Sequence, residues 1–186
     1  MPRVHTLLAS LLATSTLFAQ GPAGGSAGAI TYIRSIAVPL NAVLLFDKAT
    51  EAWTWTFGKE PGGKLLLSDR TTGTLEATAR VNYRSEQLSM REETMGAVQY
   101  RVVMNVHAGE CRITISECVH TGNRTTPRGG VHLGLLVRGP DPVVKVRGLG
   151  GSNLRRIYAE VKDTTNARIT AVLQAFEARL RASAQP

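Results

Sequence analysis

The chain has 186 residues and is 43% hydrophobic, a length and composition that fit a single domain with a sizeable core. It contains no internal repeat, and no apolar run reaches the roughly 20 residues that a membrane-spanning helix needs. The formal net charge of +8 is uneven, because residues 20–120 carry ten basic and ten acidic side chains whereas residues 121–186 carry eleven and four. The basic character therefore belongs to the C-terminal third.

The start of the chain, residues 1–19, has the layout of a secretory signal peptide. A short basic start is followed by an apolar and small-residue run that ends at Ala19, and a Gly-Pro pair soon interrupts it. We therefore expect export to the periplasm or beyond, with cleavage near Ala19. No cysteine follows the run, so no lipid anchor is expected there. Residues 20–29 predict a flexible Gly-rich leader and residues 30–183 a single domain.

The first strand and helix of the domain are predicted next. Residues 30–38 are rich in β-forming side chains and end at a proline, which is typical of a strand. Helical spacing then extends over 42–57, with Asn41 as N-cap and Gly58 as C-terminal stop. Trp55 lies off the apolar stripe and is expected to be exposed. The stripe itself comprises Val43, Phe46, Ala49, Trp53 and Phe57.

Period-two alternation predicts the strands that follow. Residues 65–68 form a short strand and 74–83 a longer one, whose core face includes the small residues Ala77 and Ala79. The strongest signal is the β-hairpin over 96–119, in which a Gly-containing turn separates two alternating runs. The core face of its first strand comprises Val98, Tyr100, Val102, Met104 and Val106.

The two cysteines both fall in the second strand of this hairpin. Continuous alternation places Cys111 on the core face and Cys118 on the opposite face. Seven residues of extended chain span about 23 Å, too far for a disulfide. We therefore expect two free thiols, of which Cys118 reacts first with a thiol reagent.

The end of the domain predicts a long excursion and a long helix. Residues 121–152 are rich in Gly and Pro, with at most one added edge strand. Asn153 is expected to cap the last helix, and low helix propensity at 163–166 suggests a bend there. Its apolar stripe, which should cover the dry face of the sheet, comprises Leu154, Ile157, Tyr158, Val161, Ile169, Val172, Leu173, Phe176 and Leu180.

Four stretches, taken with this order of elements, resemble a known family. They are Leu17-Phe18-Ala19-Gln20, Val38-Pro39, Asp69 to Gly73 with Leu75, and Leu154 to Val161. The family they resemble is the domain-of-unknown-function 4468 family of small exported proteins from Gram-negative bacteria. The resemblance covers roughly residues 30–182 and departs at the longer excursion 121–152. It implies a TATA-binding-protein-like α+β fold, in which about five antiparallel strands in β-α-β-β-β-β-α order are covered on one face by the C-terminal helix. It implies no activity.

No catalytic, cofactor or metal motif is present. The chain lacks phosphate-binding, dinucleotide-binding, nucleophile-elbow, zincin and Cys-x-x-Cys patterns. His107, His120 and His132 are too widely spaced for a local metal motif. We therefore expect no enzyme and no cofactor, although a site assembled from dispersed residues by folding stays open as an alternative.

Three functions remain. The first is a non-enzymatic domain that binds a ligand or envelope partner, in a cavity beneath the last helix if Phe176, Trp53 and Tyr100 leave one unfilled. The second is binding of an anionic surface polymer, such as lipopolysaccharide or an acidic glycan, by the basic C-terminal third. Nucleic acid is a less favoured ligand because the protein is expected to be exported. The third is the dispersed enzyme. Basic-patch candidates for the second are Arg124, Arg128, Arg138, Lys145, Arg147, Arg155 and Arg156.

Overall fold

The computed structural model describes residues 28–86, 88, 92–126, 129–139, 145–146 and 149–184. The predicted signal peptide lies outside these residues. Within them, no helix combines the length and the apolar character needed to cross a membrane.

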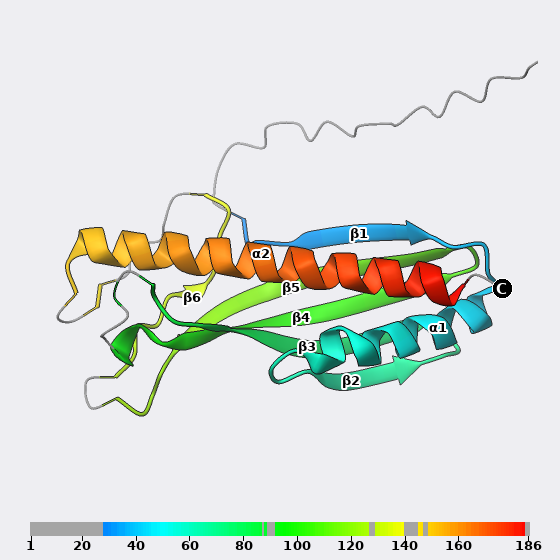
Figure 1. Cartoon of the computed structure of the whole chain (residues 1–186), viewed down its shortest axis with the longest axis horizontal. Coiled ribbons are helices and arrows are strands. Elements are labelled where there is room, and N and C mark those ends of the chain that lie inside the picture. The colour runs from blue at the N-terminus through cyan, green and yellow to red at the C-terminus, as the bar shows by residue number, and fades with distance from the viewer. Residues whose placement is uncertain are drawn as a thin grey trace, which may run out of the picture.

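A six-stranded antiparallel sheet forms the body of the domain (Figure 1). Its order is β1-β5-β4-β3-β2, and a short β6 pairs with the end of β5. Two α-helices and two short 3-10 turns, Phe57–Lys59 and Glu92–Thr94, complete the elements. The predicted α+β class and element order are confirmed, and β6 is the added edge strand. The bounds are β1 Tyr32–Ala37, α1 Ala42–Trp55, β2 Lys64–Asp69, β3 Thr74–Tyr83, β4 Gly96–His107, β5 Glu110–Gly122, β6 Gly134–Leu135 and α2 Gly151–Ser183.

Both helices lie on the same face of the sheet. Figure 1 shows α2 running lengthwise over the strands, with α1 beside its C-terminal half. The strand residues beneath them are almost fully buried, from Leu75 to Tyr83 on β3 and from Val98 to Val106 on β4. On the opposite face of the sheet, the described part of the chain places no helix. The predicted stripe of α2 is confirmed at the core, where its buried residues are Ile157, Tyr158, Val161, Thr165, Ile169, Val172, Phe176 and Leu180.

Helix α1 begins as predicted but differs in phase and in its end. Asn41 caps it, accepting the Leu44 N–H at 2.9 Å. Val43, predicted to be buried, is 52% exposed. The prediction was wrong because Val43 is followed directly by Leu44, Leu45 and Phe46. Periodicity alone cannot tell which of four consecutive apolar residues face the core. The helix ends at Trp55 with Thr56 as its C-cap, so Gly58 is not its stop. The Thr56 N–H bonds to the Trp53 carbonyl and tightens the chain into the 3-10 turn.

Helix α2 begins earlier than predicted and does not break. Gly150, not Asn153, is its N-cap, and the helix continues through residues 163–166. Thr165 in that stretch is 1% exposed and lies on the buried stripe. Packing against the sheet therefore outweighs the weak helix propensity of these residues.

Ion pairs that involve arginine side chains link α2 to the rest of the domain. Arg168 forms a two-pronged pair with Glu60 at 2.7 and 2.9 Å, and the Glu60 side chain is only 5% exposed. Arg34 of β1 pairs with Glu177 at 2.7 Å. Exposed ion pairs contribute little, so the half-buried Glu60 pair is the stronger anchor of the two.

Candidate ligand-binding groove

The face of the sheet that carries no helix is where the molecule is hollowed. Side chains alternate along a strand, so every second residue of β3, β4 and β5 projects from this open face. Register brings them into rows: Arg80 of β3 lies opposite Gln99 of β4, which lies opposite Val119 of β5. The adjacent row is Asn82, Ala97 and Thr121.

Two hollows adjoin on this face. The first has a volume of about 760 Å³ and the second about 420 Å³. Both are lined by Gln99 and Thr121, so they form one groove across β3, β4 and β5. We call this the open-face groove. Its floor is low at one end because Ala97 contributes only a methyl group there.

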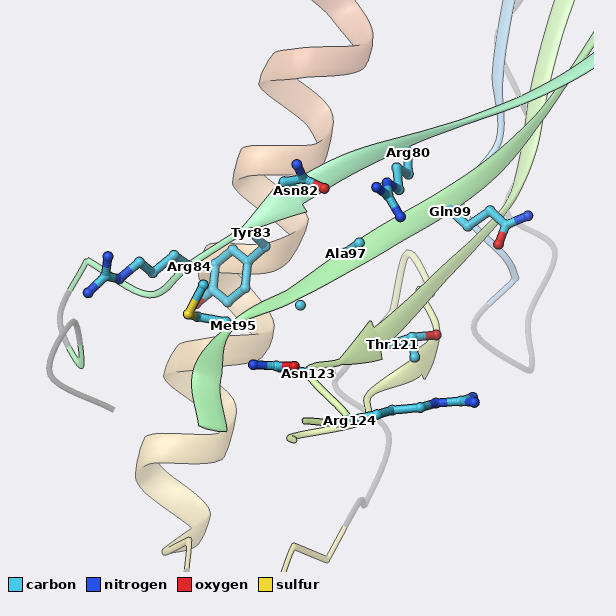
Figure 2. A pocket seen from close by; sticks show the side chains of 12 residues that line it. Arg80, Asn82, Tyr83, Arg84, Met95, Ala97, Gln99, Thr121, Asn123 and Arg124 are labelled. Atoms are coloured by element: carbon cyan, nitrogen blue, oxygen red, sulfur yellow. The ribbon is translucent and has the colours of Figure 1, made fainter. Parts of the chain in front are cut away.

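The first hollow combines guanidinium and carboxamide groups. Figure 2 shows Arg80, Asn82 and Arg84 coming from β3 and its end, and Arg124 from the turn after β5. Among the described residues Arg80 and Arg124 form no ion pair, and both are exposed. No carboxylate is among the described residues that line this hollow. Its lining residues are Arg80, Asn82, Tyr83, Arg84, Met95, Gly96, Ala97, Gln99, Thr121, Gly122, Asn123 and Arg124.

The second hollow is closer to neutral. Its one guanidinium, Arg101, is paired with Glu76 at 2.7 Å and with Glu117 at 3.5 Å. These carboxylates raise the pKa of Arg101 above its ordinary value, and the hydrogen bond that Arg101 donates to Glu76 is the main cause. Leu66 and Val119 supply apolar surface and are 53% and 38% exposed. The groove thus has a cationic end and an apolar, charge-balanced end.

A β-bulge in β5 shapes the middle of the groove. Gln99 pairs with Val119 but Arg101 with Ser116, so β5 has one extra residue between them. Glu117 takes the left-handed conformation there, with φ 55°. The extra residue reverses the alternation of everything that follows, because side chains point to opposite faces with a period of two. Val119 and Thr121 reach the groove only because of this bulge.

The bulge makes one sequence prediction wrong. Cys118 was expected on the open face, but it is fully buried at 0% exposure, as is Cys111. The two thiols are free, as predicted. Burial raises the pKa of Cys111 to about 12 and that of Cys118 to about 11, so neither carries a reactive thiolate at neutral pH.

A polar cluster lies in the core directly behind the first hollow. His120 is 1% exposed, and neither ring nitrogen has a hydrogen-bond partner among the described residues. Its ring meets Tyr83 edge-on at 5.9 Å. The Tyr83 hydroxyl donates to Glu160 at 2.7 Å, and Ser85 donates to the same oxygen at 2.8 Å. Burial, with a smaller effect of the nearby His132, lowers the pKa of His120 to about 4.

Gly96 makes room for this buried histidine. A Cβ at Gly96 would lie 2.6 Å from His120 Nε2 and equally close to the Thr121 carbonyl oxygen. Gly96 therefore serves the core, because a larger residue there would displace His120.

The predicted basic residues are only partly brought together. Arg124 lines the groove, while Arg155 and Arg156 are exposed on the first turns of α2. Arg138 donates to the Thr31 carbonyl instead. Lys145 is exposed; Arg128 and Arg147 lie outside the described residues. Sequence reasoning missed Arg80, because one arginine in an alternating strand resembles any solvent-facing residue.

The cavity considered beneath the last helix is not among these hollows. Phe176 is 0% exposed, Tyr100 1% and Trp53 8%, and all three pack into the core between helices and sheet. Phe176 contacts Phe57 with ring centroids 5.9 Å apart. The alternative that these aromatic residues fill the space is therefore the one that the structure supports.

Trp55 is 53% exposed, as predicted from its position off the stripe. Two cations lie over its ring, Lys59 at 5.0 Å and Arg179 at 5.1 Å from the centroid. The exposed indole thus joins α1 to the end of α2 through cation–π contacts. It lies on the helical side of the domain, away from the groove.

Comparison with known proteins identifies the fold. No protein-family model matches the chain, and no curated protein matches its sequence. A domain-of-unknown-function 4468 family protein from Bacteroides ovatus aligns with a TM-score of 0.53 and 15% identity, over 80% of this chain and 86% of that one. A TBP-like protein from Parabacteroides distasonis gives 0.53 and 10%, over 80% and 93%. The fold is TATA-binding-protein-like.

The resemblance inferred from the sequence is thus confirmed at the level of the fold. Identities of 15% and 10% carry no ligand or activity from one protein to another, so function is inferred from the residues of this chain. Within the described part of the chain, no cluster of three or more His, Cys, Asp or Glu is arranged to hold a metal ion.

Proposed function

We propose that this protein is a non-enzymatic binding domain, exported after removal of residues 1–19, and that its open-face groove holds an acidic saccharide. The observation that carries the proposal is the first hollow, whose described lining residues include three arginines and three carboxamides and no carboxylate. The exported location rests on the signal-peptide pattern of the sequence.

The chemistry of the two ends favours this class of ligand. Guanidinium groups bind carboxylate or sulfate oxygens through two parallel hydrogen bonds, which suits Arg80 and Arg124. Carboxamides such as those of Asn82 and Gln99 donate and accept, as sugar hydroxyl groups require. At the other end, Leu66 and Val119 offer the apolar surface against which the C–H face of a sugar ring packs. An acidic sugar carries all three kinds of group in one molecule.

The basic C-terminal third is the competing location for such a ligand. Its described members are dispersed, since Arg138 is engaged with Thr31 and Arg155 and Arg156 lie on α2. In the groove, Arg80 and Arg124 line one concave site. Ligand sites are typically concave, whereas dispersed charges on a convex surface are not. We therefore place the ligand in the groove and use the α2 arginines as the control.

The test is calorimetric titration with a hexasaccharide of uronic acid. Arg80→Gln removes one guanidinium, and a charged hydrogen bond contributes about 1.5–3 kcal/mol, so binding should weaken by roughly tenfold to a hundredfold. Ala97→Leu keeps every charge but fills the floor, and it should weaken binding as well. Arg155→Gln is the matched control and should have no effect.

Salt dependence gives a second criterion. Binding by guanidinium groups should weaken as the salt concentration is raised, because exposed charges are screened. The proposal is wrong if the hexasaccharide does not bind at low salt, or if Arg155→Gln weakens binding while Arg80→Gln and Ala97→Leu leave it unchanged. The second result would move the site to the C-terminal third.

A further inference from the structure

The outer edge of β2 is open. The strand hydrogen-bonds only to β3, and no other backbone hydrogen bond of the described residues involves Lys64–Asp69. In Figure 1 it forms the lower border of the sheet. Leu66 and Leu67 are 53% and 46% exposed on this strand. An exposed apolar edge with unpaired backbone groups is a template for another strand.

The opposite edge of the sheet is protected, which makes the β2 edge distinctive. At β1 the Thr31 carbonyl accepts from Arg138, and the Ala37 carbonyl accepts from Arg181 at 3.1 Å. Arg34, within β1, is held by Glu177. Arginine side chains therefore occupy the β1 edge, whereas β2 presents leucines.

The sequence of β2 is complementary to itself when it is read antiparallel. Pairing the strand with its own reverse sets Lys64 opposite Asp69, Leu65 opposite Ser68, and Leu66 opposite Leu67. Opposite charges then meet at both ends, and the leucines meet in the middle. Among the described residues Lys64 forms no ion pair.

This pairing requires that paired residues of β2 point to the same face of the sheet, and a bulge within β2 makes this possible. Its register with β3 shifts between Leu65 and Leu67, so Leu66 is an extra residue. Lys64 and Asp69 consequently both lie opposite open-face threonines of β3, and Leu65 and Ser68 both lie opposite core-face residues. Without the extra residue, each of these pairs would point to opposite faces.

We propose that two copies of this chain associate through antiparallel pairing of their β2 strands, about a two-fold axis perpendicular to the sheet. The two sheets become one continuous sheet with both open faces on the same side. Six residues a side is far fewer than the roughly 20 to 30 of a stable interface, so the dimer is weak and forms with rising protein concentration. Because Leu66 also lines the groove, the seam lies beside the ligand site.

Sedimentation velocity over a wide range of protein concentrations tests this without any ligand. The wild-type protein should shift from monomer mass toward twice that mass. Lys64→Asp sets like charges opposite each other at both ends of the seam and should shift the transition to at least tenfold higher concentration. Adding Asp69→Lys to that variant should restore it. Leu67→Lys should abolish the dimer, and Ile33→Lys, an equally exposed site on β1, should leave it unchanged.

The outcomes separate this inference from the proposed ligand. A wild-type protein that stays monomeric throughout overturns it, as does a dimer that Ile33→Lys disrupts and Leu67→Lys does not. Circular dichroism confirms that each variant is folded. Asp69 accepts hydrogen bonds from Thr71, so Asp69→Lys could unfold the protein by breaking that turn. In that case the test is the difference in dimerisation between Leu67→Lys and Ile33→Lys. Saccharide binding plays no part in any of these readings.

Discussion

Acidification should destabilise this protein through one buried histidine. His120 is 1% exposed, its two ring nitrogens are unpaired among the described residues, and burial lowers its pKa from 6.5 to about 4. The unfolded chain binds the proton below about pH 6.5, whereas the folded chain does so only near pH 4. The contribution of His120 to stability is therefore complete above pH 6.5 and is lost as the pH falls toward 4. Each pH unit is worth about 1.4 kcal/mol, which gives about 3 kcal/mol in total.

The assay is urea unfolding at pH 7.5 and at pH 4.5, for the wild type and for His120→Leu. Carboxylates also titrate in this range, so the quantity of interest is the difference between the two proteins. Wild type should lose about 2.5 kcal/mol more than the variant between these two pH values, because pH 4.5 is still above the folded pKa of His120. His107→Leu, at an exposed site at the end of β4, is the control and should behave as wild type. Equal acid sensitivity of wild type and His120→Leu would refute the reasoning.

Three further predictions concern the strands. Thiol reagents should modify neither Cys111 nor Cys118 in the native protein and both after unfolding, and mass spectrometry of native protein carrying one label would contradict this. Glu117→Ile should cost about 1–2 kcal/mol in urea unfolding, because a branched side chain is strained at φ 55°, whereas Glu117→Gly should not; equal costs would argue against the bulge. Gly73→Ala should lower the melting temperature by several degrees, since its Cβ would lie 2.2 Å from the Val106 carbonyl oxygen at φ 68°, and an unchanged melting temperature would contradict that geometry.

The elements of this fold follow from local patterns in the sequence. Alternation over residues 74–83 and 96–107 predicts β3 and β4 at their observed bounds, because each strand has one buried face and one solvated face. The apolar stripe of α2 is predicted equally well by its helical periodicity. What fails is phase: Val43 and Cys118 were assigned to the wrong face, the first by a run of four apolar residues and the second by an extra residue at Glu117. A bulge depends on how β5 pairs with β4, and the sequence of one strand alone carries no information about that pairing.

The candidate site was less predictable than the fold, for a similar reason. Arg124 was selected for its place in the basic third, but Arg80 and Gln99 come from residues 20–120, whose net charge is zero. Only the register brings them into one row, and the small side chain of Ala97 between larger neighbours turns that row into a hollow. The predicted export of the chain is a property of its first 19 residues and stays a prediction.

The central claim is that the open-face groove is the ligand site, and amide chemical-shift mapping tests it most directly. Titrating the labelled protein with the uronic acid hexasaccharide should move the signals of Ala97, Gln99 and Thr121, which line the groove on β4 and β5. Signals of Arg155 and Arg156 on α2 should stay in place. Shifts confined to the α2 residues, or none in the groove at saturating hexasaccharide, would contradict the claim.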